Sequence, residues 1–343
     1  MGVKMKTYDV TALGELLIDF TENGVSAQGN PLLEANPGGA PCNVLAMLKQ
    51  LSKKTAFIGK IGEDIFGRQL ESALRSVGIE TCGLKKSKEV RTTLAFVHTM
   101  EDGDREFSFY RNPGADMALE ESDLEEELIR KSRIFHYGSL SMTHESCRLA
   151  TRRAIDVAKE GGAVLSFDPN LRESLWESLA DAREQILYGM AYCQILKISD
   201  NEIQWLTGEE DFDKGIAWIR ERFSIPLILL SLGKEGSRAY TEGKRVECPA
   251  FVQEKTVETT GAGDTFCACV LNYALENLLA DGAMENEESR TLFAENCKAC
   301  TEEQLMEMLR FANAAASIIT TRKGALRVMP AREEVEAFLA EKA

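Results

Sequence analysis

The stretch from Glu258 to Phe266, Glu-Thr-Thr-Gly-Ala-Gly-Asp-Thr-Phe, contains the residue types that a phosphate-handling site needs. Gly261 and Gly263 tolerate positive φ and let a ligand approach the backbone, so the amides of Ala262, Gly263 and Asp264 can converge on one point. The apolar residues that follow recur at helical spacing, which places this point at a helix N-terminus. Such an end carries partial positive charge and unpaired N–H donors. The stretch is therefore suited to hold a phosphoryl group and to stabilise the charge that develops during its transfer.

Asp264 is the unusual member of this stretch, because a carboxylate at a phosphate site repels the ligand unless it performs a task. Positioning a hydroxyl nucleophile and accepting its proton is such a task. Its place at a helix N-terminus predicts that Asp264 is ionised at neutral pH. The alternative is a glycine turn in which Asp264 caps the helix. These few residues leave both interpretations open.

Composition limits the classes to which the protein can belong. With 343 residues, 44% of them hydrophobic, the chain can bury the core of one large domain. Asp and Glu number 55 against 40 Lys and Arg, and the net charge of -15 argues against nucleic acid or an acidic membrane surface as a partner. The chain has no apolar run of transmembrane length, its start lacks the apolar core of a signal peptide, and its nine scattered cysteines favour reduced thiols. We therefore expect a cytoplasmic protein.

Strand and helix patterns alternate along the chain, which predicts a parallel sheet covered by helices on both faces. Residues 10–19 are expected to form one buried strand that ends in the carboxylate of Asp19. From Arg91 to Arg111 the period is two and an Asp-Gly pair interrupts it, so a hairpin should project from the main sheet. The other expected elements are helix 41–51, strand 55–59, helix 64–76, strand 133–137, helix 145–160, strand 163–168, helix 179–188, strand 194–198, helices 201–206 and 214–222, and strand 227–231.

Asp19, Gly38, Gly39 and Asn43 form a group suited to a polyol. A carboxylate accepts hydroxyl protons, glycines expose backbone amides, and an asparagine offers a donor and an acceptor. Arg111, after the hairpin, could contact a sugar oxygen or a phosphate. Each of these residues taken alone is more often a turn, cap or solvated residue.

Further candidate residues follow later strands, where ligands of parallel sheets bind. Asp168-Pro169-Asn170-Leu171-Arg172 ends one strand, and Glu202 lies in the first turn of a helix, where a simple cap is the alternative. A glycine loop from Ser231 to Gly236 follows another strand. The chain contains neither GxxxxGK[ST] nor a full GxGxxG, so it lacks the P-loop and dinucleotide motifs.

Together these segments resemble the ribokinase-like (PfkB) carbohydrate kinases, above all bacterial fructokinases, in the family's order from about Val10 to about Gly324. Gly-Ala-Gly-Asp resembles the second family signature, and Gly-Gly-Ala-Pro-Cys-Asn at 38–43 resembles the first. The resemblance implies an α/β fold, a three-layer α/β/α sandwich with a central, mostly parallel sheet and a small β-strand lid. It implies one kinase domain over residues 7–343, with lid strands from about 25–36 and 91–111 inserted.

The resemblance also assigns roles to single residues. The catalytic group comprises the base Asp264, the anion hole Gly261, Ala262 and Gly263, and the phosphate contact Arg172. The implied sugar contacts are Asp19, Gly38, Gly39, Asn43, Arg111 and Asn170. The implied nucleotide contacts are Lys197, Ser231, Gly233, Gly236 and Asn313. Glu202 would organise Mg²⁺ through water, and Glu258 and Thr260 would lie at a K⁺ site.

The implied reaction transfers the γ-phosphoryl group of ATP, with Mg²⁺, to a primary hydroxyl. D-Fructose, giving fructose 6-phosphate, is our first choice, and 2-keto-3-deoxygluconate, ribose or nucleoside kinases are alternatives that lid contacts decide. A non-catalytic sugar-binding sensor is the alternative from another class, although its signature would be a lost base or a broken anion hole. The expected partners are a small sugar and ATP, without nucleic acid or membrane, and lid pairing in relatives implies a homodimer.

Three features depart from the family pattern. Glu258 stands where Asp is usual, which leaves potassium activation open, and Ser199 stands where Asn is familiar. The acidic stretch 281–301 is extra and contains Cys297 and Cys300. A zinc site needs a second ligand pair and the chain has three histidines, so we expect unpaired surface thiols.

Overall fold

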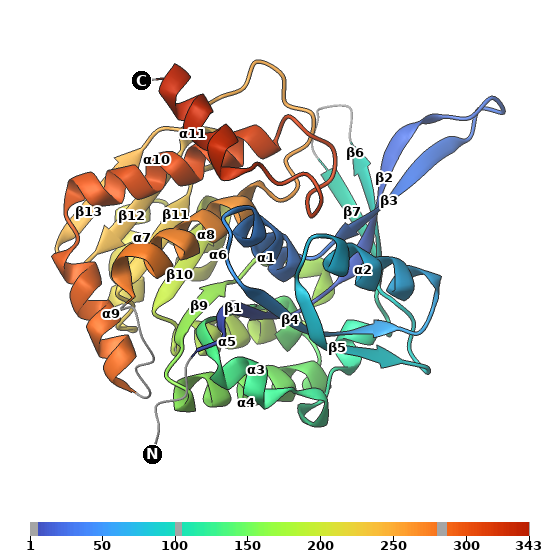
Figure 1. Cartoon of the computed structure of the whole chain (residues 1–343), viewed down its shortest axis with the longest axis horizontal. Helices are drawn as coiled ribbons and strands as arrows, with labels where there is room; N and C mark the ends of the chain where they lie inside the picture. Colours follow the sequence, from blue (N-terminus) through green and yellow to red (C-terminus); the bar gives the residue numbers. More distant parts are fainter. Residues whose placement is uncertain (1–5, 100–104, 280–286, 343) are drawn as a thin grey trace.

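The computed structural model describes residues 6–99, 105–279 and 287–342, which form a large central sheet and a smaller one (Figure 1). The central sheet has nine strands in the order β13-β12-β11-β10-β9-β8-β1-β4-β5. Neighbouring strands pair in parallel from β11 to β5, and only β12 and β13 are antiparallel additions at one edge. The bounds are β1 Tyr8–Leu13, β4 Thr55–Gly62, β5 Glu80–Ser87, β8 Ser132–Gly138, β9 Val164–Asp168, β10 Ile195–Ser199, β11 Leu227–Ser231, β12 Ser237–Thr241 and β13 Lys244–Cys248.

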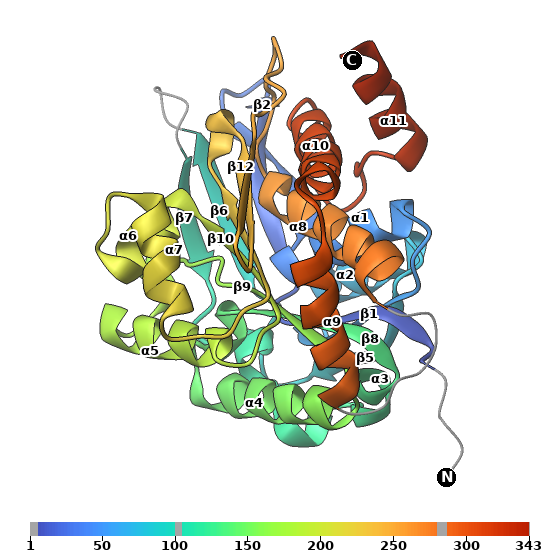
Figure 2. The ribbon, with the colours of Figure 1, turned by 90° about the vertical axis from the view of Figure 1, so that its left-hand side faces the viewer.

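Helices cover both faces of this sheet, as the alternating pattern predicted (Figure 2). One hydrophobic cluster joins the sheet to α1 Ala40–Gln50, α2 Ile65–Ser76, α8 Ala262–Tyr273, α9 Glu287–Ala299, α10 Glu302–Ile319 and α11 Arg332–Glu341. A second cluster joins the opposite face to α3 Glu126–Arg130, α4 Glu145–Glu160, α5 Leu179–Met190, α6 Asp200–Thr207 and α7 Phe212–Arg220. Successive side chains of a strand point to opposite faces, so Val164 belongs to the first cluster and Leu165 to the second. The expected three-layer α/β/α architecture is confirmed.

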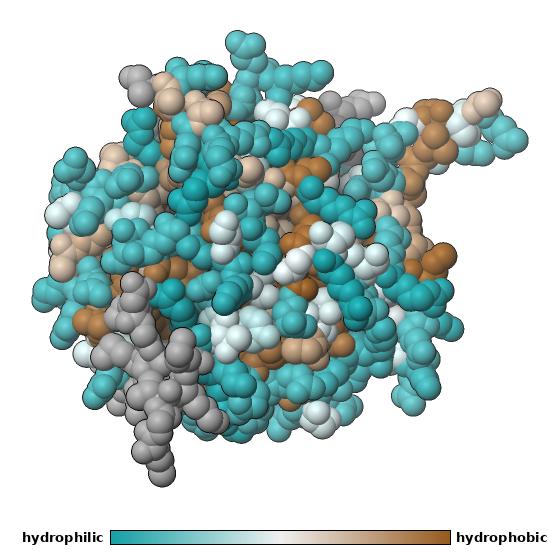
Figure 3. All heavy atoms as spheres, in the orientation of Figure 1, coloured by the Kyte–Doolittle hydropathy of each residue, from teal (hydrophilic) through white to brown (hydrophobic). Residues whose placement is uncertain are grey.

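The smaller sheet is the lid, with four strands in the order β3-β2-β6-β7. Its bounds are β2 Leu17–Val25, β3 Pro31–Gly38, β6 Leu94–Thr99 and β7 Arg105–Tyr110. The predicted hairpin pairs as β6 and β7 and lies outside the central sheet, while its Asp-Gly turn falls outside the described residues. The long β2–β3 arm projects from the molecule and exposes apolar side chains, including Val25, Leu32 and Leu33 (Figures 1 and 3).

The prediction of one strand over residues 10–19 is wrong. The chain leaves the central sheet after Leu13 and enters the lid at Leu17, so Asp19 is a lid residue. At the bend, a methyl group on Gly14 would lie 2.6 Å from Pro41 Cγ, which shows how closely the chain passes the start of α1. The apolar run continues through the bend because both sheets bury it, and a hydrophobic pattern does not report a change of sheet.

The extra stretch near residue 290 forms α9, and the prediction that its cysteines are surface thiols is wrong. Cys297 is 1% exposed and Cys300 is 4% exposed, and both are free thiols. Phe293 is also fully buried, so an apolar face of α9 packs on the body while polar and charged residues of both signs occupy the rest. The acidic composition concealed this face.

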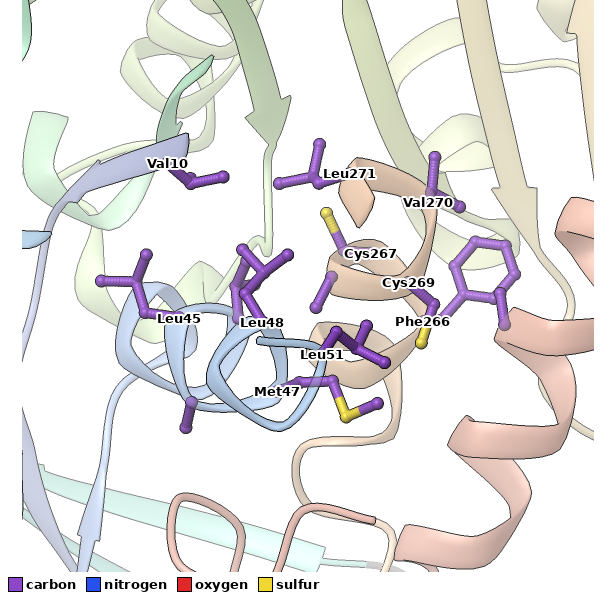
Figure 4. Close-up of a cluster of buried hydrophobic side chains, with 14 of the residues drawn as sticks. Val10, Leu45, Met47, Leu48, Leu51, Phe266, Cys267, Cys269, Val270 and Leu271 are labelled. Atoms are coloured by element: carbon purple, nitrogen blue, oxygen red, sulfur yellow. The ribbon is translucent and has the colours of Figure 1, made fainter. Parts of the chain in front are cut away.

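Helices α1 and α8 pack side by side (Figure 4), and their first turns are joined by the hydrogen bond from Asn43 to Asp264. Leu48 of α1, Leu51 directly after α1, and Cys267 of α8 lie between the two helices (Figure 4). All three side chains are at most 1% exposed. This core fixes the first turn of one helix relative to that of the other.

Among the helices of the described residues, none combines the length and the hydropathy that a membrane span requires.

Candidate active site

A cavity of about 1010 Å³ lies where β9, β10 and β11 end and the lid faces the starts of α1 and α8. Of the predicted residues, it is lined by Asp19, Gly39, Asn43, Asn170, Arg172, Lys197, Glu202, Ser231, Gly233, Glu258, Thr260, Gly261, Gly263 and Asp264. These residues come from segments spread over most of the chain. Folding thus brings most of the predicted sugar, phosphate and nucleotide groups into one cavity at the carboxyl ends of parallel strands.

Asp264 lies in the first turn of α8 and is held by α1. Asn43 Nδ2 donates to Asp264 Oδ2 at 2.8 Å, although the two residues are 221 positions apart. Burial raises the pKa of Asp264 above the ordinary aspartate value, and Asn43, Lys197 and Arg172 offset part of this rise. The sequence predicted only the stabilising influence of the helix end. The raised pKa suits a proton acceptor better than a strongly acidic carboxyl would, because a base works best with a pKa nearer the working pH.

Fewer backbone amides than expected are available at the predicted anion hole. Gly261 is the residue before the helix, with φ of 80°, in the left-handed region that favours glycine. The Ala262 N–H donates to Thr259 O at 3.2 Å, and Ala262 does not line the cavity. Gly263 and Asp264 carry the following N–H groups, which have no acceptor within the helix. An anion at this helix start would therefore be bound mainly by the amides of Gly263 and Asp264.

Lys197 lies beside this helix start and is held by a residue that the sequence did not single out. Its Nζ is 3.1 Å from Asp168 Oδ2, and both side chains are buried. A methyl group on Gly263 would lie 3.4 Å from Lys197 Nζ, so the ammonium group is next to the anion hole. Burial lowers the pKa of Lys197, but the carboxylates of Asp168 and Glu202 outweigh this effect and the net shift is upward, which keeps the amine charged. Asp168 is the first residue of the predicted Asp-x-Asn-x-Arg segment, and this motif was the available signal.

Asn170 and Arg172 follow β9 and line the cavity. Asn170 has φ of 45°, a left-handed conformation that is uncommon for a residue other than glycine and is often found at functional sites. Arg172 Nη1 donates to Leu171 O at 3.0 Å. The charge of Arg172 also lowers the pKa of Asp264, so the two side chains act on the same part of the cavity.

Glu202 is held in place by three hydrogen bonds. Its Oε1 accepts the Leu171 N–H at 2.8 Å, and its Oε2 accepts the N–H and the hydroxyl of Ser199, each at 2.8 Å. A carboxylate offers about four acceptor positions, so little of Glu202 is left for direct metal coordination. The residues fit a magnesium ion that keeps its waters, with Glu202 accepting hydrogen bonds from them. Within the described chain, no group of three Cys, His, Asp or Glu side chains forms a protein-only metal site.

The glycines of the first signature make room for carboxylates and backbone. A methyl group on Gly38 would overlap Asp19 Oδ2, and one on Gly39 would overlap the carbonyl oxygen of Glu15. Gly38 itself does not line the cavity. Asn43 is 3% exposed, and its Oδ1 has no hydrogen-bond partner among the described residues, although the residue lines the cavity. A buried acceptor of this kind is suited to a ligand hydroxyl.

Glu15 was missed by sequence reasoning. It lines the cavity at 4% exposure, and its Oε1 accepts the Ala40 N–H at 2.7 Å, which fixes the start of α1. Burial raises the pKa of Glu15 to about 7, and the charge of Asp116 adds to the rise. A carboxylate directly after a buried strand was the signal, but the wrong assignment of residues 10–19 to one strand hid it.

Arg111, Gly236 and Asn313 do not line the cavity. The guanidinium of Arg111 bonds Asp116 Oδ2 at 2.7 Å, Thr143 Oγ1 at 2.8 Å and the Leu140 carbonyl at 2.9 Å. Asn313 Nδ2 donates to the carbonyl oxygens of Cys248, at the end of β13, and Pro249, each at 3.1 Å. A methyl group on Gly236 would overlap the carbonyl oxygen of Cys248. In this structure these three residues hold the walls of the site together.

Acidic side chains outnumber basic ones in the lining of the cavity. Two basic side chains, Arg172 and Lys197, line the cavity with seven acidic ones: Glu15, Asp19, Glu173, Asp200, Glu202, Glu258 and Asp264. A polyphosphate entering this field is repelled unless its charge is neutralised. The fold and the cavity thus define a ribokinase-like α/β protein in which a glycine turn starts a helix beside a carboxylate.

Comparison with known proteins identifies the family. The model of the pfkB family of carbohydrate kinases matches residues 8–332. Fructokinase-1 of Zea mays is 41% identical over 328 residues, which cover 95% of this chain and 96% of that protein. The chain therefore belongs to the pfkB carbohydrate kinase family.

Solved structures agree with this assignment. The structure of a fructokinase with bound ATP from Xylella fastidiosa superimposes with a TM-score of 0.86 at 28% identity, covering 97% of this chain and 98% of that one. A fructokinase double mutant from Vibrio cholerae O395, in a form with fructose, ADP and potassium ion bound, gives a TM-score of 0.81 at 27% identity, covering 98% and 100%. Lid and central sheet are therefore both family features.

Proposed function

We propose that this chain transfers the γ-phosphoryl group of ATP to the primary hydroxyl of D-fructose and so forms fructose 6-phosphate. The observation that carries the proposal is the pair formed by Asn43 and Asp264, which places a partly buried carboxylate at a helix start suited to an anion, inside a cavity roofed by the lid. Full-length relatives named fructokinase favour fructose over ribose, nucleosides or 2-keto-3-deoxygluconate.

Each group in the cavity has a separate role in the phosphoryl transfer. Asp264 orients the attacking hydroxyl and accepts its proton as the oxygen–phosphorus bond forms, while ADP leaves with the electrons of the bond that breaks. The amides of Gly263 and Asp264 stabilise the charge on the phosphoryl oxygens, and the cations of Arg172 and Lys197 add to this field. Asn43 keeps the carboxylate turned toward the cavity.

Magnesium would enter with the nucleotide. Glu202 would hold its waters, and the bound ion would neutralise part of the charge on the transferring phosphate. Ser231 and Gly233, at the end of β11, line the cavity on the side assigned to the nucleotide. This arrangement accounts for a phosphate site in a cavity that is rich in carboxylates.

A coupled ADP-release assay over a sugar panel tests the proposal. We expect turnover that requires Mg²⁺ and has its highest kcat/KM with D-fructose. Asp264→Asn should lower kcat roughly 10²-fold or more, because the amide cannot accept the proton. An unchanged kcat in this variant would show that Asp264 is not the catalytic base. A higher kcat/KM with another sugar would mean that this sugar, and not fructose, is the substrate. Binding of a sugar without any turnover would mean that the protein is a non-catalytic sugar sensor.

We also infer a homodimer that pairs through the lid. The β2–β3 arm exposes Val25 at 67%, and its neighbours Leu32 and Leu33 are 47% and 43% exposed. Exposed apolar side chains that gather on a projecting hairpin are typical of a protein contact surface. Light scattering should give the mass of two chains, and Leu33→Asp should give the mass of one. A wild-type monomer would contradict the inference.

A further inference from the structure

Glu258 lies in the loop that leads into α8 and connects this loop to a distant segment. The residue is 8% exposed, and its Oε2 accepts the Gly324 N–H at 2.8 Å. Beside it, the backbone N–H groups of Val257 and Glu258 both donate to Thr320 O, at 2.8 and 3.0 Å. The loop before the anion hole is thus bonded to the segment that follows α10 by both its backbone and a side chain.

The same two segments touch at the anion hole itself. A methyl group on Gly261 would lie 2.9 Å from the Cβ of Ala325, so the glycine before α8 packs directly on the residue after Gly324. Gly261 and Gly324 both have φ of 80°. A shift of Gly324 would therefore reach Gly261 and change the direction of the amides that follow it.

The turn at Gly324 also touches the lid. Lys323 Nζ donates to Asn23 Oδ1 on β2 at 3.1 Å, and a methyl group on Gly324 would lie 3.5 Å from Asn36 Oδ1 on β3. Glu258 consequently connects a turn under the lid to the helix start that binds the anion. It is buried, so solvent does not screen this contact strongly.

We propose that the Glu258 side chain is a built-in latch that positions the anion hole and makes catalysis independent of potassium. The inference rests on the proposed kinase reaction. In the potassium-bound fructokinase of Vibrio cholerae a cation is present. In this chain the Gly324 N–H donates to Glu258 Oε2. The positive end of this N–H group attracts the carboxylate and repels a cation. The residues therefore do not fit a potassium site built on this oxygen.

The length of the side chain is the basis of the test. Glu258→Asp removes one methylene, so the carboxylate no longer reaches Gly324, whereas Glu258→Gln keeps the length and an acceptor oxygen. The kcat and the KM values for ATP and fructose are measured in potassium chloride and in choline chloride at equal ionic strength. The thermal midpoint Tm of each protein is measured in the same two salts without substrates.

For wild type, we expect less than about a twofold difference in kcat between the salts and no change in Tm. Glu258→Asp should lose kcat roughly tenfold in choline chloride, because a hydrogen bond to a charged group is lost, with smaller changes in KM. Potassium should restore this kcat and raise the Tm of that variant. Glu258→Gln should keep most of the activity and not respond to potassium.

Three results would overturn the latch. They are stimulation of wild-type kcat by potassium of about tenfold or more, a Tm of wild type that rises in potassium chloride, and a Glu258→Gln variant as impaired as Glu258→Asp. If no sugar is phosphorylated by wild type, the proposed function fails, and the Tm measurements still decide whether the site takes potassium.

Discussion

The half of the cavity under the lid and the half at the start of α8 present different chemical groups to a ligand. Under the lid, polar side chains converge from separate elements, with Asp19 on β2 and Asn43 on α1. At the start of α8, backbone amides and the buried pair of Lys197 and Asp168 define the site. Backbone groups are fixed once the fold is fixed, whereas side chains can be exchanged. The comparison indicates that a chain of this fold can change its sugar without rebuilding its phosphate site.

The sharpest test of the backbone half is Gly261→Ala. The left-handed φ and the closeness of Ala325 should turn the first amides of α8, and kcat should fall about 10²-fold. Gly208→Ala is the matched control, since Gly208 has φ of 74° at the end of α6 and no atom within 4 Å of an added methyl group. Steady-state kinetics and Tm are measured for both. An equal loss of kcat in the two variants would mean that backbone strain alone, not the anion hole, causes the effect.

Lys197→Met tests the ion pair in the same half. Without its partner, the buried carboxylate of Asp168 should lower the free energy of unfolding by about 3 kcal/mol, measured by urea denaturation. The kcat/KM for ATP should fall by roughly tenfold or more, because a charge beside the anion is lost. Adding Asp168→Asn should restore much of the stability and none of the kcat/KM. Recovery of both would show that Lys197 acts only through stability.

Asn43→Ala connects the two halves through the pKa of Asp264. The Asn43 hydrogen bond favours the ionised carboxylate, so its loss should raise that pKa further. A base must be ionised to work, so the acidic limb of the profile of kcat/KM against pH should move to higher pH. Cys42→Ala is a control that alters a buried neighbour without removing the hydrogen bond. If the acidic limb does not move in Asn43→Ala, it does not report the ionisation of Asp264.

Arg111→Lys should have the smallest effect on catalysis. A lysine cannot make all the bonds of the guanidinium to Asp116, Thr143 and the Leu140 carbonyl, so unfolding free energy should fall by about 1–3 kcal/mol. The KM for fructose should change by less than about threefold, since the group that changes lies behind the cavity wall. A large rise in KM with unchanged stability would make Arg111 a sugar contact after all.

Local patterns predicted much of the fold and of the phosphate half. The helix over 145–160 was predicted with its observed ends, and the strand over 227–231 likewise, because helical and strand periods are set by the backbone. The segment from Gly261 to Asp264 was informative because one contiguous glycine-rich turn supplies most of that site. What such patterns missed are contacts between distant elements, among them Glu15 with the start of α1.

The sequence by itself therefore determined the alternating βα architecture, the projecting hairpin and a glycine turn that starts a helix beside a carboxylate. These features depend on residues close together in the chain. Only the tertiary structure placed Asp19 in the lid, turned Arg111 away from the cavity, buried Cys297 and paired Lys197 with Asp168. Those outcomes depend on which surfaces pack together, and a local pattern of apolar and polar residues is compatible with more than one such packing.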